Sequence, residues 1–281
     1  MLDKVEFINL VPKFLDFYHM ANKPDVDHEK RWILWQKHYN FAAVPPGEEG
    51  KITARNLLDS AWDTYSERVK MLENWKPNSE KIKEYLTKVK KLLGYDRPIN
   101  LVVVYFVGGF ENNPFVAPYD ENRLVLCLPI ENGESDILLS HELTHIVHSQ
   151  TANLTADWER TIGSTILQEG LAMQVSKFLV PGEPIELYIE HSEGWLTSCY
   201  EKKSDIITGI LPYLEDSSSE AVTMFTFGSG TTNREREAYF VGWEIVQYLL
   251  TEGVTFKEIA RIQQKDIPNY LREIYPFLIV E

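Results

Sequence analysis

The spacing of apolar residues along the first part of the chain indicates helices. Between Leu57 and Leu72 apolar side chains recur every three or four residues, as the buried face of an amphipathic helix requires. The stretch from Ser79 to Leu93 repeats this spacing and stops at Gly94, a residue type that commonly ends helices. We therefore predict a helical N-terminal region over residues 1–95, packed on a core formed by residues 96–281.

The pattern changes at residue 100. A run of β-branched and aromatic residues from Asn100 to Val107 ends at two glycines and predicts a strand, and Leu124 to Ile130 predicts a second. Helical spacing then returns. Periodicity places further helices at about 136–149, 160–178, 193–213, 235–251 and 267–278. The expected fold class is α+β, mostly helical, with a small mixed sheet.

Composition and charge narrow the classes of partner. The chain has 28 lysines and arginines against 42 aspartates and glutamates, a net charge of -14 that repels nucleic acid and anionic lipid surfaces. No window approaches the length of uncharged apolar chain that spans a bilayer. The first residues lack a secretory signal. The two cysteines, Cys127 and Cys199, have apolar or aromatic neighbours, which is typical of reduced, buried thiols. We expect a cytoplasmic protein without nucleic-acid or membrane partners.

One five-residue motif carries the candidate chemistry. His141-Glu142-Leu143-Thr144-His145 matches HExxH, in which two histidines four residues apart share one face of a helix, about 6 Å apart. Both imidazoles can therefore bind one zinc ion, while Glu142 points elsewhere and can act on a water held by the metal. Apolar residues fill the other sides of this helix, so polar groups here are costly unless something binds them.

Zinc needs a third protein ligand, and three arrangements can be compared. The metzincin continuation requires glycine at 148 and histidine at 151, whereas the chain has His148 and Thr151. Asp157 is a second candidate, although its surroundings are typical of a helix entry. Glu169 is the third and the stronger, because it shares a helical stripe with apolar residues and needs a counter-charge. Gly170 beside it would let its helix approach the HExxH helix closely.

His148 lies one turn beyond His145 on the same helix face. Three ligands from consecutive turns of one helix cannot surround an ion tetrahedrally, so we interpret His148 as a core residue or as a partner of a ligand.

Together these residues resemble the gluzincin branch of zincin metallopeptidases. More narrowly, the chain is similar to the bacterial family of predicted zinc-dependent proteases catalogued as a domain of unknown function. The segments that carry the resemblance, within residues 100–250, are a strand followed by Gly108-Gly109, His141 to His148, Gln168-Glu169-Gly170-Leu171-Ala172, and Tyr239-Phe240-Val241-Gly242-Trp243. Met173 departs from thermolysin-like enzymes, which have an aspartate there.

The resemblance implies a zincin-like core, in which an edge strand next to the active-site helix holds extended peptide by main-chain pairing. Leu124 to Ile130 would be that strand. His141, His145 and Glu169 would hold Zn²⁺, and Glu142 would be the general base of peptide hydrolysis.

An oxyanion-stabilising donor is also expected. Tyr239 is our choice, with His191 as the rival, because Tyr239 opens a helix next to Arg234 and Arg236.

Two rival hypotheses remain open. The chain could be a metal-binding or regulatory module of the same fold without peptide turnover, although the intact Glu142 argues against this. A structural zinc site usually uses four Cys and His ligands, and no cysteine is near the motif. The motifs of serine hydrolases and of nucleotide-binding loops are absent. These observations indicate that the substrate is a peptide or a protein.

Overall fold

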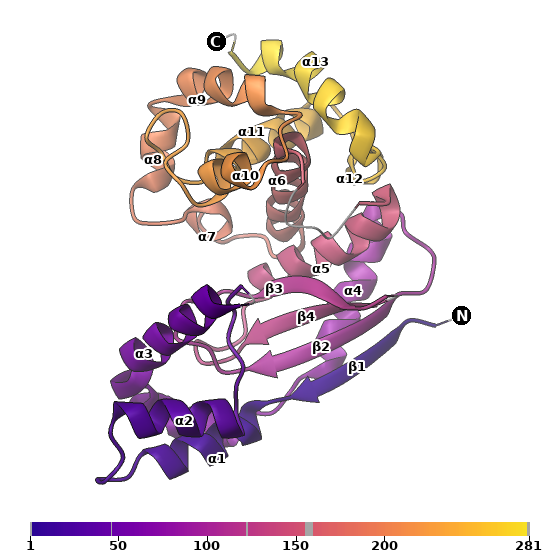
Figure 1. Cartoon of the computed structure of the whole chain (residues 1–281). Coiled ribbons are helices and arrows are strands. Elements are labelled where there is room, and N and C mark those ends of the chain that lie inside the picture. The colour runs from indigo at the N-terminus through magenta and orange to yellow at the C-terminus, as the bar shows by residue number, and fades with distance from the viewer. Residues whose placement is uncertain (1, 46, 122, 155–159, 280–281) are drawn as a thin grey trace. The chain divides into compact units, whose positions relative to one another are not determined.

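A computed structural model describes residues 2–45, 47–121, 123–154 and 160–279 (Figure 1). The fold is α+β, as predicted: mostly helical, with one four-stranded mixed sheet. The chain forms two compact units, one of Met1–Lys83 with Arg97–Ser135 and one of Glu84–Asp96 with Asp136–Glu281. The division into domains at residue 95 stays a prediction, and so does the placement of the sheet next to the HExxH helix.

The first unit contains the sheet. Its strands are β1 (Lys4–Asn9), β2 (Asn100–Phe106), β3 (Phe115–Asp120) and β4 (Arg123–Pro129), in the order β1-β2-β4-β3 (Figure 1). β2 is parallel to both β1 and β4, and β3 is antiparallel to β4. The structure confirms both predicted strands as β2 and β4.

Two expectations about this unit were wrong. The segment from Leu124 to Ile130 is not an edge strand, because β4 lies between β2 and β3. The first 95 residues are not all helical, because β1 opens the chain. The edge strands β1 and β3 were not predicted, and the reasons are physical. β1 is partly exposed and includes charged residues at positions 4 and 6, and Pro118 within β3 is tolerated only where a strand has a free side.

The central strand β2 is buried on both faces beyond its first residue. Valines and phenylalanine from one of its faces form a core with β4 residues and with Phe41 and Phe115. A parallel strand covered on both sides is expected to be a continuous apolar run, which is why β2 was recognisable in the sequence. The helices that accompany the sheet in the first unit are α1 (Val11–Ala21), α2 (His28–His38) and α3 (Glu48–Asn74), and α4 (Ser79–Leu93) continues into the second unit.

The second unit is helical. Its helices are α5 (Asp136–Ala152), α6 (Ile162–Leu179), α7 (Glu186–Ile189), α8 (Trp195–Tyr200), α9 (Lys203–Ile210), α10 (Ser219–Thr226), α11 (Glu237–Thr251), α12 (Phe256–Ile259) and α13 (Ile267–Ile279), with single 3-10 turns η1 (Leu211–Tyr213) and η2 (Gln264–Asp266). The expected long helix at 193–213 is broken at Glu201 and Lys202, between α8 and α9. α6 is buried from Ile162 to Ser176 and packs against α5 and, most extensively, α11.

Gly170 on α6 has a different partner from the one expected. A Cβ added to Gly170 would lie 2.1 Å from the carbonyl oxygen of Gly242 on α11, and a Cβ on Gly242 would lie 2.3 Å from the carbonyl oxygen of Ile166. The glycine therefore permits backbone contact between α6 and α11, whereas we expected it to serve the approach to the HExxH helix. Two facing glycines let two helices approach more closely than side chains allow.

Replacement of Gly170 by alanine should lower the free energy of unfolding by about 3 kcal/mol, because the new methyl group must push two helix backbones apart. Alanine ordinarily favours a helix over glycine by about 1 kcal/mol, so a loss of stability would report the contact alone. Urea denaturation measures the change. Gly163→Ala in the same helix is the matched comparison, because its Cβ would lie 3.1 Å from the nearest atom, the Leu214 carbonyl oxygen, so a smaller loss is expected than for Gly170→Ala. Stabilisation by Gly170→Ala would contradict the contact.

Both cysteines are buried and free, Cys127 in the first unit and Cys199 in the second. None of the helices in the described parts of the chain is both long enough and apolar enough to cross a bilayer.

Candidate metal centre

The HExxH motif lies on α5, as predicted, with its two histidines on one face. Their Nε2 atoms are 3.0 Å apart. Hydrogen bonds from neighbouring helices hold the first turn of α5: the Tyr85 hydroxyl donates to Asp136 Oδ2 at 2.8 Å, and the Ser176 hydroxyl of α6 donates to the Ile137 carbonyl oxygen at 3.1 Å. The histidine pair therefore projects from a helix that is fixed at its start.

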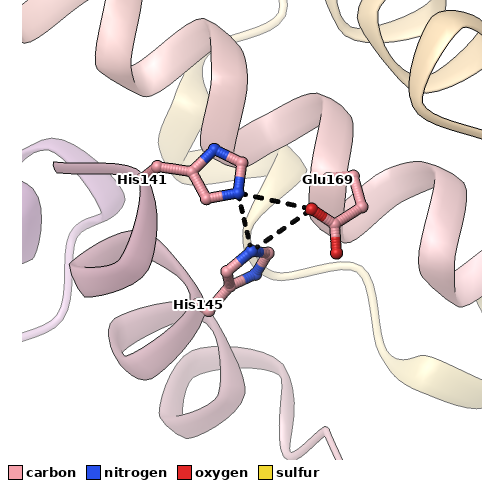
Figure 2. A group of neighbouring side chains, drawn as sticks. All are labelled: His141, His145 and Glu169. Atoms are coloured by element: carbon pink, nitrogen blue, oxygen red, sulfur yellow. Dashed lines mark hydrogen bonds and ion pairs between the residues drawn. The ribbon is translucent and has the colours of Figure 1, made fainter. Parts of the chain in front are cut away.

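Glu169 of α6 faces this pair. Its Oε2 atom lies 3.3 Å from the Nε2 atom of His141 and 3.4 Å from that of His145 (Figure 2). Glu169 is 4% exposed, so its carboxylate has little contact with solvent. Within the described residues, these three side chains form the one group of three or more His, Cys, Asp or Glu residues that could hold a metal ion. The alternative ligand Asp157 lies outside the described residues.

The three facing atoms fit a zinc ion. Zinc bonds to nitrogen and oxygen of about 2.0 to 2.1 Å, arranged tetrahedrally, place neighbouring ligand atoms about 3.3 Å apart. The observed separations of 3.0, 3.3 and 3.4 Å form such a triangle with only small adjustment. Two imidazoles and one carboxylate are also the donor set of catalytic zinc sites, which leave a fourth position open. The residues present therefore suit zinc.

The cluster contains a buried negative charge, the carboxylate of Glu169, that a bound cation would stabilise. Burial lowers the pKa of His141. Burial also opposes the charged forms of His145 and Glu169, but their mutual attraction prevails: the pKa of His145 is raised, and that of Glu169 is held well below its ordinary value. The buried carboxylate is thus stabilised by the charges of His145 and Arg160 and by hydrogen bonds from the two histidines. A divalent ion would take over that role.

Glu142 belongs to the same turn as His141 but is not part of the ligand triangle. It is 8% exposed, and burial raises its pKa to about 8. No hydrogen bond to its carboxylate is found within the described part of the chain, so the group is not committed to a structural contact. This is the environment expected of a carboxyl group that exchanges protons near neutral pH.

His148 is not a ligand in this arrangement. Its ring is fully buried, and neither nitrogen finds a hydrogen-bond partner among residues that the structure describes. Burial lowers its pKa to about 3, so the ring is neutral. Of the two interpretations from sequence, the core residue agrees better with these surroundings than the partner of a ligand.

Tyr239, the expected oxyanion donor, lies in the first turn of α11. Burial raises its pKa to about 12, and the negative charge of Glu169 raises it further. The Arg236 guanidinium stacks 3.8 Å from the centre of the Tyr239 ring. His191, the rival donor, accepts a 3.5 Å contact from Arg236 at Nδ1 and lies 2.9 Å from Glu235 at Nε2. Arg234 instead donates to the Ser198 carbonyl oxygen at 3.4 Å.

Two charged residues of this region were missed in the sequence. Glu237 is fully buried, and its carboxylate accepts four hydrogen bonds, from the backbone and hydroxyl groups of Thr231 and Thr232 at 2.7 to 3.1 Å. These bonds fix the loop that leads into Arg236 and Tyr239. Arg160 donates to Glu169 at 2.9 Å. The one sequence signal for Arg160 is its position directly before the helix that carries Glu169.

A comparison with known protein families places this geometry in context. The family described as predicted Zn-dependent protease (DUF2268) matches residues 112–269, which is more than half of the 281 residues. The chain belongs to this family. The match includes every residue of the ligand triangle, together with Glu142 and Tyr239. No curated protein and no solved structure matches the chain. The match confirms the resemblance to this family, and the resemblance to gluzincins stays a prediction.

Proposed function

We propose that the protein is a zinc-dependent peptidase of the gluzincin type with a zincin-like core. The observation that carries the proposal is the triangle of His141 Nε2, His145 Nε2 and Glu169 Oε2, with the uncommitted carboxylate of Glu142 on the same helix turn. The description of the family, a predicted Zn-dependent protease, supports the same function. The substrates are peptides or proteins.

The three ligand residues would hold Zn²⁺, which when bound polarises a carbonyl group and lowers the pKa of water. The protein supplies the proton transfers. Glu142 takes the proton of the attacking water and delivers it to the leaving amine, and a pKa near neutrality suits a group that must do both.

Tyr239 supplies a hydrogen bond to the oxyanion in this proposal. With a pKa of about 12 it keeps its proton at neutral pH and can donate. Arg236 packs on the ring and restricts its orientation, and the hydrogen bonds to Glu237 fix the backbone from which both side chains project.

The direct test compares the zinc-loaded protein, the chelator-treated protein and the reloaded protein on a library of unstructured peptides, with bound zinc determined by elemental analysis. We expect one zinc per chain and cleavage that disappears with the metal and returns with it. Zinc binding without cleavage of any peptide would instead favour the metal-binding or regulatory module without turnover. Absence of zinc binding would exclude both functions.

A further inference from the structure

The two oxygens of the Glu169 carboxylate have different partners. Oε2 faces the Nε2 atoms of His141 and His145 at 3.3 and 3.4 Å (Figure 2). Oε1 accepts a hydrogen bond from Nη2 of Arg160 at 2.9 Å. A carboxylate that is free on both sides can bind a metal through one oxygen or through two. Here one of the two is already engaged by a cation.

Arg160 is itself held on the surface of α6. Its Nε atom donates to the Thr165 hydroxyl at 3.1 Å, and its Nη1 atom makes a longer contact of 3.5 Å with Gln168 Oε1. Together with the bond to Glu169, the planar guanidinium spans a little more than one turn of this helix. The side chain is 24% exposed, so most of it is withdrawn from solvent. Because its other N–H groups are already engaged, the guanidinium of Arg160 cannot move with the Glu169 carboxylate if that carboxylate rotates.

The negative charge of Glu169 explains why the positively charged Arg160 lies beside a site for a metal ion. Thr165 and Gln168 are neutral, so Glu169 is the one charged group that the guanidinium contacts through a described hydrogen bond. A carboxylate buried as deeply as Glu169 is costly without a counter-charge, and Arg160 supplies one whether or not metal is present. The negative charge on Oε2 is then available in a fixed direction.

We propose that Arg160 is a positioning residue of the metal centre, which holds Glu169 Oε1 so that Glu169 binds the metal through Oε2 alone. This inference rests on the proposed zinc site. Hydrogen-bonded partners of metal ligands typically contribute about 10- to 100-fold to metal affinity through orientation of the ligand. Arg160 would also keep the coordination number low, leaving room for water and substrate.

The test uses the full-length protein and its variants Arg160→Gln and Arg160→Lys. Zinc dissociation constants are measured by competition with a chromophoric chelator, and folding of each metal-free variant is checked by circular dichroism and thermal unfolding. We expect Arg160→Gln to bind zinc about 10- to 100-fold more weakly. Arg160→Lys, which keeps the charge but not the planar fork, should fall between Arg160→Gln and the unmodified protein.

Cobalt(II) in place of zinc gives a second readout that a merely structural role would not change. Its visible d–d bands weaken when the coordination number rises from four to five. Arg160→Gln should therefore show weaker bands, because Oε1 becomes free to bind the metal as well. Arg160→Lys should again be intermediate, and it keeps the proposal testable if the glutamine variant does not fold.

Arg272→Gln is the matched control. Arg272 also donates to a glutamate, Glu215 at 2.6 Å, and to a side-chain amide, Asn269 at 3.2 Å, but this pair is exposed. Its removal should change neither zinc affinity nor the cobalt spectrum. If the Arg160 variants match the unmodified protein in both measurements, the role of Arg160 is overturned and the zinc site stands. If the unmodified protein binds no zinc, the proposed function fails as well.

Discussion

Replacing Glu142 with glutamine should leave zinc binding intact and lower kcat/KM for peptide hydrolysis by about 10²- to 10⁴-fold, the contribution typical of a general acid or base. Glutamine has nearly the same shape as glutamate but can neither take up nor release the proton. Glu142 is outside the ligand triangle, so the metal should remain. Steady-state kinetics on a cleaved peptide, with zinc content measured on the same sample, give both quantities.

Glu244→Gln is a suitable control for this substitution. Glu244 is also a mostly buried glutamate of the second unit, but it forms an ion pair with Lys203 at 2.7 Å and is distant in sequence from the motif. Its replacement should leave hydrolysis unchanged. Full activity in the Glu142→Gln variant would show that another group moves the proton and would remove the reason for assigning base catalysis to this helix turn.

Replacing Glu169 with glutamine should abolish useful zinc binding, with a loss of affinity larger than the roughly 100-fold that partners of ligands contribute. The amide oxygen carries no net charge, so the ligand triangle loses its anionic member. Hydrolysis should disappear with the metal. Isothermal titration of the metal-free protein with zinc measures the affinity, and His148→Gln serves as the control, because His148 is on the same helix but is not a member of the ligand group.

The same substitution has a consequence for stability that needs no metal. Glu169→Gln leaves the guanidinium of Arg160 without its carboxylate, and breaking one side of a buried pair commonly costs about 3 to 5 kcal/mol. Because Arg160 is partly exposed, we expect a value at or below the lower end of this range. Urea denaturation of the metal-free proteins measures it. An unchanged midpoint would mean that solvent replaces the pair at no cost.

The long apolar elements were predictable from the sequence. β2 was recognisable as a continuous apolar run, and α5, most of α6 and α11 were recognisable as long segments rich in apolar residues. The facing of His141 and His145 followed from helix geometry alone, because the i and i+4 relation is local. For the same reason the pattern of residues was enough to give the general location of the candidate site.

The parts that could not be predicted depend on contacts between segments distant in sequence. Nothing local shows that Gly170 meets Gly242, or that Glu237 is surrounded by Thr231 and Thr232. Arg160 looks like an ordinary charged residue at a helix entry until Glu169 is placed opposite it. The edge strands β1 and β3 were missed because a half-exposed strand has too few buried positions to show a period.

The contact between Gly170 and Gly242 restricts the motions by which the proposed peptidase could admit a substrate. Gly170 is adjacent to Glu169 in α6, and Gly242 lies about one turn beyond Tyr239 in α11. With the two main chains touching, neither helix can slide or rotate against its neighbour without a steric clash. The main-chain segments that carry Glu169 and Tyr239 are therefore expected to move together, so that a wider approach to these two side chains would have to come from segments outside this helix pair.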